Sequence, residues 1–112
     1  MVDMLNKSGV HKFYPFQFPD TLNCSTIDIS GGTVKRGGVQ KVYMRIVTRE
    51  KHPSLAIQKA NEIKEYLYAN AKGAFFDGLK VIQIDADTPE PLYIGEENGA
   101  YSVSWNYTII EG

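Results

Sequence analysis

The sequence predicts an α+β fold, in which one long amphipathic helix packs on one face of a mainly antiparallel or mixed four-stranded sheet. Three patterns carry this prediction. Apolar residues recur at every third or fourth position over residues 53–71, as in a helix with one buried face. They alternate with polar residues over 40–49 and again over 101–109, as in strands with one buried face.

The chain has 112 residues and a formal net charge of −1 at pH 7. This length suits one domain, so we expect residues 1–112 to form a single domain. A nearly neutral chain has no global field to draw it to nucleic acid or to an anionic membrane. The lone Cys24 cannot form an intramolecular disulfide, which fits a reducing cytosol. No apolar run approaches the roughly 20 residues that cross a bilayer, and the first residues lack the features of a signal peptide. We therefore expect a soluble protein made in the cytosol.

The first third of the chain predicts short elements. Residues 1–10 allow a brief N-terminal helix. Residues 13–19 are aromatic and punctuated by prolines, so we expect them to run extended and to pack flat on another element. Residues 24–30 predict a strand with Ile27 and Ile29 on one face.

A glycine-bracketed loop and a long strand follow. Residues 31–38 lack the Gly-Lys-Ser/Thr ending of a phosphate-binding loop, and no helix begins after them. We therefore expect a mobile loop that orders on assembly. Residues 40–49 predict a strand. Its apolar face holds Val42, Met44 and Ile46, and its other face holds Lys41, Tyr43, Arg45, Val47 and Arg49.

The helix over residues 53–71 has the clearest boundaries. Pro53 suits its first turn, and Gly73 is a natural stop. Its apolar stripe is formed by Ala56, Ala60, Ile63 and Leu67, and its opposite side by Lys59, Glu62, Lys64 and Glu65.

The last third predicts two strands and a hairpin. Residues 79–86 form a third strand, which the two prolines of residues 87–91 end. Residues 92–94 form a short extended piece, and Asn98-Gly99 is a strong hairpin signal before the final strand. The apolar face of the final strand packs on the core, while its small polar face looks at solvent or at a neighbour. The core is expected to include Val42, Met44, Ile46, Ile63, Leu67, Val81 or Leu79, Val103 and Trp105.

Few residues suggest chemistry. His11 and His52 lie in different segments without further ligands at metal spacing, so we expect no metal site. Cys24 precedes a strand and lacks a helix N-terminus, which favours a buried, inert thiol over a nucleophile. The acidic residues from Asp85 to Glu97 favour solvated turn charges over catalytic carboxylates. We expect no catalytic residue and no cofactor, and therefore no enzyme.

A basic row leaves nucleic-acid binding open as an alternative. Only Tyr43 stands among its charges as a stacking residue, and a solvated or partner-facing strand explains the row as well. The row consists of Lys35, Arg36, Lys41, Arg45 and Arg49.

Three stretches carry a resemblance to a known family. Residues 18–32 (FPDTLNCSTIDISGG) resemble the family segment "PDsPdNcvtIydtGG". Residues 42–49 (VYMRIVTR), with the helix after them, resemble "vqvrvRa…A…A..I...L". Residues 91–107 (PLYIGEENGAYSVSWNY) resemble "P.flG.DenGr..fsvNf.v". In this order and spacing, the chain resembles the phage minor capsid or tail-terminator family, which is similar in fold to the lambda tail terminator.

The resemblance implies a structural role in the virion. Such subunits assemble, usually as a hexamer, into a homo-oligomeric ring that caps the tail tube and meets the head-completion protein. DNA passes through the ring without specific binding. The implied location is the tail or neck of the virion, after assembly in the host bacterial cytoplasm, with no membrane partner. Another neck or head-tail joining protein, a stopper or an adaptor, remains an alternative.

A ring contact joins two unlike surfaces of each subunit. Basic residues of the first hairpin (Lys35, Arg36 and Arg45) and acidic residues near the last one (Glu90, Glu96 and Glu97) are candidates for the two surfaces. Exposed ion pairs contribute little, so apolar contacts must supply most of the binding. The candidates for these contacts are Tyr14, Phe16, Phe18, Phe75, Phe76 and Tyr93.

Overall fold

The computed structural model describes residues 13–15, 24–31, 40–71, 73, 75–76, 79–97 and 99–111. Their elements, in chain order, are β1 (Phe13–Pro15), β2 (Cys24–Gly31), β3 (Gln40–Glu50), α2 (Pro53–Asn70), β4 (Phe75–Phe76), β5 (Leu79–Ala86), β6 (Leu92–Glu97) and β7 (Ala100–Glu111). The predicted helix within residues 1–10 and the predicted loop beyond Gly31 lie outside the described residues, as do His11, Lys35 and Arg36.

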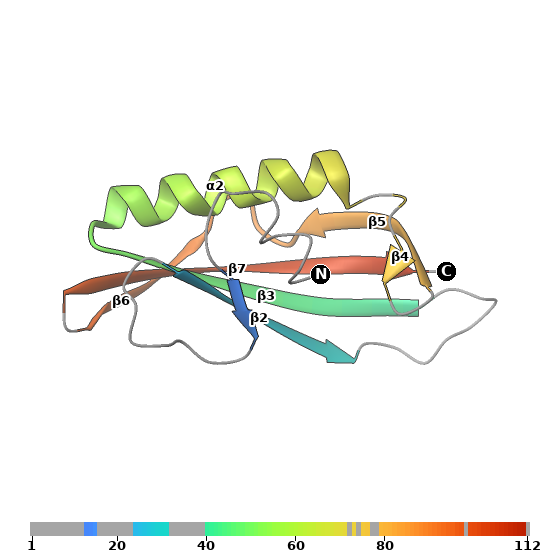
Figure 1. Ribbon diagram of the computed structural model, residues 1–112, viewed down its shortest axis with the longest axis horizontal. Coiled ribbons are helices and arrows are strands. Elements are labelled where there is room, and N and C mark those ends of the chain that lie inside the picture. The colour runs from blue at the N-terminus through green and yellow to red at the C-terminus, as the bar shows by residue number, and fades with distance from the viewer. Residues whose placement is uncertain are drawn as a thin grey trace.

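One sheet contains all of these strands, with β1, β2, β3 and β7 in that spatial order (Figure 1). β5 and β6 follow one another along the far edge of β7, beside residues 107–111 and 100–104 respectively. Every pairing is antiparallel except the parallel pair of β1 and β2. The predicted α+β class with a mainly antiparallel or mixed sheet is confirmed. The four predicted strands are present, and β1, β4 and β6 are three shorter strands beyond that count.

The helix α2 lies along one face of this sheet (Figure 1). His52 occupies its N-cap with extended backbone angles (φ −132°, ψ 142°), and Pro53 takes the first turn. The His52 side chain makes no capping hydrogen bond. At the other end the Ala71 N–H donates to the Leu67 carbonyl, one residue from the predicted end. Gly73 follows with φ +87°, a left-handed conformation that a glycine adopts without strain.

The core lies between α2 and the sheet. The predicted stripe of α2 is buried, and it packs with the alternating apolar residues of β3 and β7. This burial confirms the predicted core, although the Leu79 side chain lies outside the described part of the chain. The core residues include Ile27, Val42, Met44, Ile46, Ala56, Ala60, Ile63, Leu67, Val81, Ile84, Val103, Trp105, Tyr107 and Ile109.

The opposite sheet face divides into two parts. Towards the β6 end, Val47 and Ser104 are buried although they alternate with the core residues. Towards the other end, Tyr43, Arg45 and Asn106 are exposed. The expectation that this whole face looks at solvent or at a neighbour therefore holds for only one part of it in a single chain. We call the exposed part the polar face.

Candidate functional site

Side chains that could bind a metal ion do not cluster in the described part of the chain. No group of three His, Cys, Asp or Glu side chains there could hold a metal ion. Over the same residues, no helix is long and apolar enough to cross a membrane.

Cys24 lies buried at the start of β2, as predicted. Burial raises the pKa of its thiol, and the Arg49 guanidinium, which donates to Cys24 Sγ at 3.7 Å, offsets only part of this shift. The thiol therefore stays protonated near neutral pH, which is the less nucleophilic form.

The polar face carries one row of polar side chains across neighbouring elements. Asp28, Arg45 and Asn106 are cross-strand partners on β2, β3 and β7. The Asp87 N–H then donates to the Asn106 carbonyl at 2.8 Å. The row lies in an open depression of about 390 Å³. Its lining is mostly polar or charged, whereas small-molecule pockets are mostly apolar.

Charges of both signs alternate on the polar face. Arg45 Nη2 lies 3.9 Å from Asp28 Oδ2, and both side chains are about half exposed, so this ion pair contributes about 0–1 kcal/mol. Lys41 adds a second exposed cation, while Asp85 and Asp87 add two exposed carboxylates. This mixture is not the continuous positive stripe that binds a phosphate backbone.

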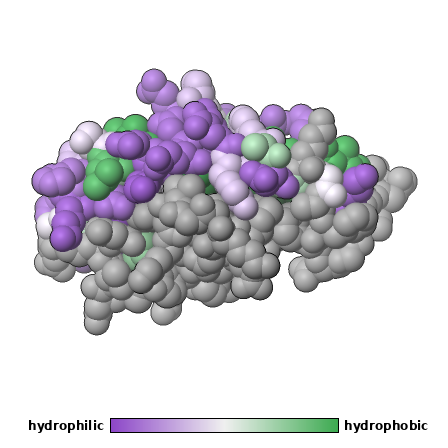
Figure 2. Space-filling model, turned by 45° about the horizontal axis from the view of Figure 1, so that its top comes forward, coloured by the Kyte–Doolittle hydropathy of each residue, from purple (hydrophilic) through white to green (hydrophobic). Residues whose placement is uncertain are grey.

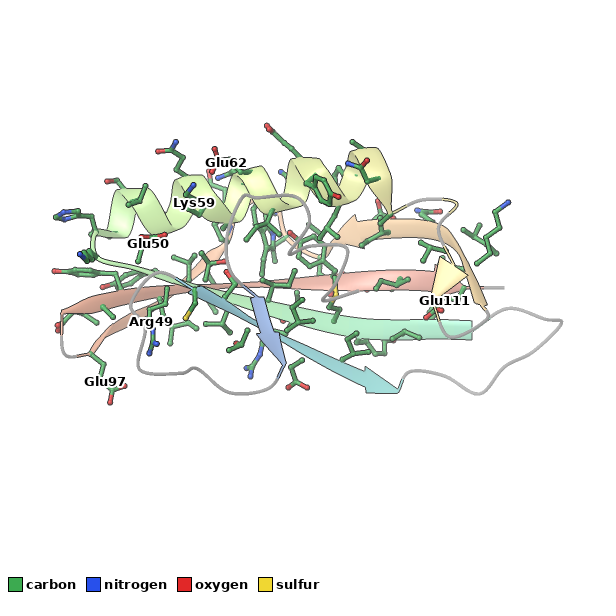
Figure 3. The ribbon with its side chains drawn as sticks, in the orientation of Figure 1. Arg49, Glu50, Lys59, Glu62, Glu97 and Glu111 are labelled. Carbon is green, nitrogen blue, oxygen red and sulfur yellow. The ribbon has the colours of Figure 1, made fainter. Side chains whose placement is uncertain are left out.

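Arg49 departs from the predicted basic row. It shares the face of Arg45 but is only partly exposed, and it donates to Cys24. In Figure 3 its side chain points to the side of the sheet away from α2. The alternation of side chains along β3 predicted the face of Arg49 correctly. It could not predict that this end of the face is covered.

Other segments of the chain bond to parts of the sheet's edges. β1 pairs with Ser25–Ile27 of β2. On the outer edge of β5, β4 pairs with Leu79 and Lys80, and the Gly73 N–H donates to the Val81 carbonyl at 2.8 Å. The Ala86 N–H of the same edge donates to the hydroxyl oxygen of Tyr68 on α2 at 2.8 Å. These contacts occupy backbone groups that would otherwise be free to pair with another chain.

Besides the outermost strands β1 and β4 and the part of β5 beyond Lys80, two edge segments pair with no other described strand on their outer side. One is β6, and the other is the second half of β2, Asp28–Gly31. They lie on opposite edges of the sheet, because β2, β3, β7 and β6 are neighbours in that order.

β6 exposes three consecutive apolar side chains. Leu92, Tyr93 and Ile94 are 70%, 49% and 55% exposed. An irregularity between Tyr93 and Gly95 leaves Ile94 without a partner on β7, and Gly95 follows with φ +151°. We call these three side chains the apolar edge. Sequence reasoning singled out only Tyr93, although the run of three apolar residues between Pro91 and an acidic pair was a visible signal.

Acidic residues flank the apolar edge. Glu90 and Glu97 are exposed, and Glu97 points away from α2 at the hairpin end of β6 (Figure 3). The Glu96 carboxylate accepts a hydrogen bond from the Gly99 N–H at 2.7 Å and so stabilises the turn. The structure therefore brings Glu90, Tyr93, Glu96 and Glu97 into one region. Arg45 lies two strands away on β3.

The other surface of the molecule is different in character. Figure 2 shows that hydrophilic residues cover much of the α2 side, with hydrophobic surface near both ends. The remaining aromatic candidates, Tyr14, Phe16, Phe18, Phe75 and Phe76, have side chains outside the described set.

Comparisons with known proteins give a likeness of fold. No family model matches the sequence, and no curated protein matches it. Among solved structures, the chain is similar to a chain from the "virion of native gene transfer agent (GTA) particle", with a TM-score of 0.60 and 11% sequence identity. The match covers 97% of this chain and 84% of that one. The two chains therefore share a fold over almost all of this protein.

Proposed function

We propose that the protein is a non-enzymatic structural subunit of a tailed-phage or prophage virion, which assembles with copies of itself into a ring. The apolar edge carries this proposal. Three consecutive exposed apolar residues on an edge strand invite pairing with another chain, and natural proteins usually blunt such an edge. Here the edge of β5 is covered while β6 is exposed, which fits a surface kept for assembly.

The fold likeness to a virion chain supports a structural role in a virion, and the sequence resemblance is the basis for proposing a specific place in the particle. In this role the protein is a tail terminator: a ring, of six copies in the family, caps the tail tube and joins it to the head-completion protein. DNA passes through the ring without specific binding. The mixed charges of the polar face fit a conduit that does not hold its cargo.

Two alternatives lead to different expectations. Another neck protein, a stopper or adaptor, would also assemble but would not bind the end of a tail tube. A nucleic-acid-binding module would bind DNA with a steep salt dependence. The covered position of Arg49 and the carboxylates beside Arg45 weigh against the second alternative.

A lysine in the apolar edge tests the assembly proposal. Ile94→Lys places a charge where a second chain would pack, so we expect the wild type to sediment as a ring and this variant as a monomer. Ile82→Lys is the matched control. Ile82 is also an exposed isoleucine (44%) at an irregularity of a strand, but β4 lies beside this strand, and Gly73 and Tyr68 bond to its outer edge at Val81 and Ala86, on either side of Ile82. We expect the control to assemble as the wild type does.

Circular dichroism should show that both variants are folded. Assembly of Ile94→Lys at the wild-type concentration would contradict the role of the apolar edge. Added to growing tail tubes, the wild type should stop elongation if the protein is a terminator, and tubes that grow unchanged would exclude that role.

A further inference from the structure

The ring needs a second surface that receives β6, and the sheet offers one. We propose that β6 of one copy pairs with the second half of β2 of the next copy, so that one antiparallel sheet continues from subunit to subunit. This inference rests on the proposed ring-forming function and names the two surfaces that close the ring.

The second half of β2 is suited to receive a strand. The pairing of β1 with β2 ends at Ile27, and beyond that residue no described strand pairs with Asp28–Gly31 on the outer side. Ile29 is 43% exposed there. It shares a sheet face with Met44 and the core, and Tyr93 shares the same face through its partner Val103. The two edges would therefore bring apolar side chains together on the α2 side of a joined sheet.

Strand directions favour this pair. β2 is antiparallel to β3, β3 to β7, and β7 to β6, so β2 and β6 run in opposite directions. Rotation about a ring axis leaves the direction of a strand along that axis unchanged. β6 would therefore meet β2 of the next copy as an antiparallel neighbour, which is the slightly more stable arrangement. Because the two edges differ, the contact is heterologous and repeats around a ring.

The displacement of the two edges along the strands fits a closed ring. β6 lies beside Ala100–Ser104 of β7, whereas the second half of β2 lies beside Val42–Arg45 of β3. Since Val47 pairs with Ser104, the centres of the edges differ by about five residues, or roughly 17 Å at about 3.4 Å per residue. Four strands about 4.8 Å apart give a lateral repeat of about 19 Å. The strands would then tilt by about 40° from the ring axis, within the range of roughly 35–45° found in closed barrels.

Pairing of β6 with β1 would not give this tilt. β1 lies beside Ser25–Ile27, which pair with Ile46–Thr48 on β3. Along the strand direction, β1 is therefore almost level with β6. The strands would stand nearly upright in such a ring. The stagger therefore favours the second half of β2 over β1.

Charges on the polar face fit the same pair. Glu97, opposite Ala100, lies on the side of the sheet that also carries Lys41 and Arg45. Both cations are exposed and lie on β3, next to the receiving half of β2. The long Arg45–Asp28 distance of 3.9 Å leaves Arg45 able to turn towards a second carboxylate. Such pairs would set the register of the contact more than its strength.

Cysteine cross-linking between copies tests the pairing. We would make Ile29→Cys and Tyr93→Cys for the α2 side of the joined sheet, and Asp28→Cys and Ile94→Cys for the polar side, because an antiparallel register that places Ile29 opposite Tyr93 places Asp28 opposite Ile94. A disulfide requires Cα atoms within about 4.4–6.8 Å, so each pair reports direct contact. Mixing the two single variants of a pair under oxidising conditions, with a short thiol cross-linker in parallel, should give covalent dimers for at least one pair. Neither single variant should give them alone.

Controls separate the possible outcomes. The parent protein, whose Cys24 is 0% exposed, shows the background. Ile29→Cys mixed with Ile82→Cys should give no dimers, because the edge of β5 is covered. If the parent forms rings and neither pair cross-links, or if Tyr93→Cys cross-links only to itself, the inference is wrong while the ring remains. If the parent forms no ring, the proposed function itself fails.

Discussion

Trp105 connects three parts of the molecule through one side chain. Its buried indole donates from Nε1 to the Thr88 carbonyl at 2.9 Å, and the Lys64 ammonium of α2 lies 4.6 Å from its ring centre. The indole thus holds the segment with the two prolines against β7. Because β6 follows this segment directly, the same side chain helps to determine where the apolar edge lies.

Tyr107 makes a prediction about pH. Burial, with a smaller contribution from Tyr68, raises the pKa of its phenol above the ordinary value of about 10. The unfolded chain therefore loses this proton at a lower pH than the folded chain does. Stability from this group is fully present below about pH 10 and is lost as the pH rises further.

Urea unfolding of wild type and Tyr107→Phe at pH 8 and at higher pH tests this sign. The variant should lose less stability than the wild type as the pH rises above the ordinary tyrosine pKa. Tyr93→Phe, an exposed tyrosine, should behave as the wild type does. Equal pH dependence in Tyr107→Phe and wild type would contradict the argument.

Single residues also show what the alternation of side chains along a strand can predict. The alternation in β3 places Arg45 and Arg49 on one face, and the structure agrees. Only the structure shows that Arg45 is exposed while Arg49 is partly covered beside Cys24. Burial of a strand face depends on what packs over it from elsewhere in the chain, and a local pattern does not contain that.

At the scale of elements, long periodic segments were predictable because their own burial produces the pattern. The stripe of α2 and the alternation of β7 are both buried as expected. β6 has no such pattern. Leu92, Tyr93 and Ile94 would read equally well as a short buried strand, and their exposure follows from pairing with β7 on one side only.

The helix face makes a quantitative prediction. Ile63 is 1% exposed within the core, so Ile63→Ala should destabilise the protein by about 2–5 kcal/mol through lost burial and a residual cavity. Ile57 of the same helix is 42% exposed, and Ile57→Ala should change stability by less than about 0.5 kcal/mol. Urea denaturation measures both. Equal losses in the two variants would mean that the buried face of α2 is misassigned.

At the scale of the whole molecule, the distribution of covered and exposed edges distinguishes this sheet from one that functions alone. β4, Gly73 and Tyr68 contact the outer edge of β5 at Leu79–Val81 and Ala86, while β6 and the second half of β2 lie on opposite edges of the sheet. This arrangement suits head-to-tail assembly of identical copies. The sequence alone placed candidate charges near both hairpins, but the pairing of strands decides which backbone edges remain open.

Electron microscopy of the purified wild-type protein over a range of concentrations tests the ring most directly. A lateral repeat of about 19 Å with a stagger of about 17 Å gives about 25 Å per copy, so six copies would form a sheet circle about 50 Å in diameter. We expect closed rings of one size, with the continuous sheet near this diameter. A protein that stays monomeric at every concentration, forms two-fold dimers or grows into open filaments would contradict the account.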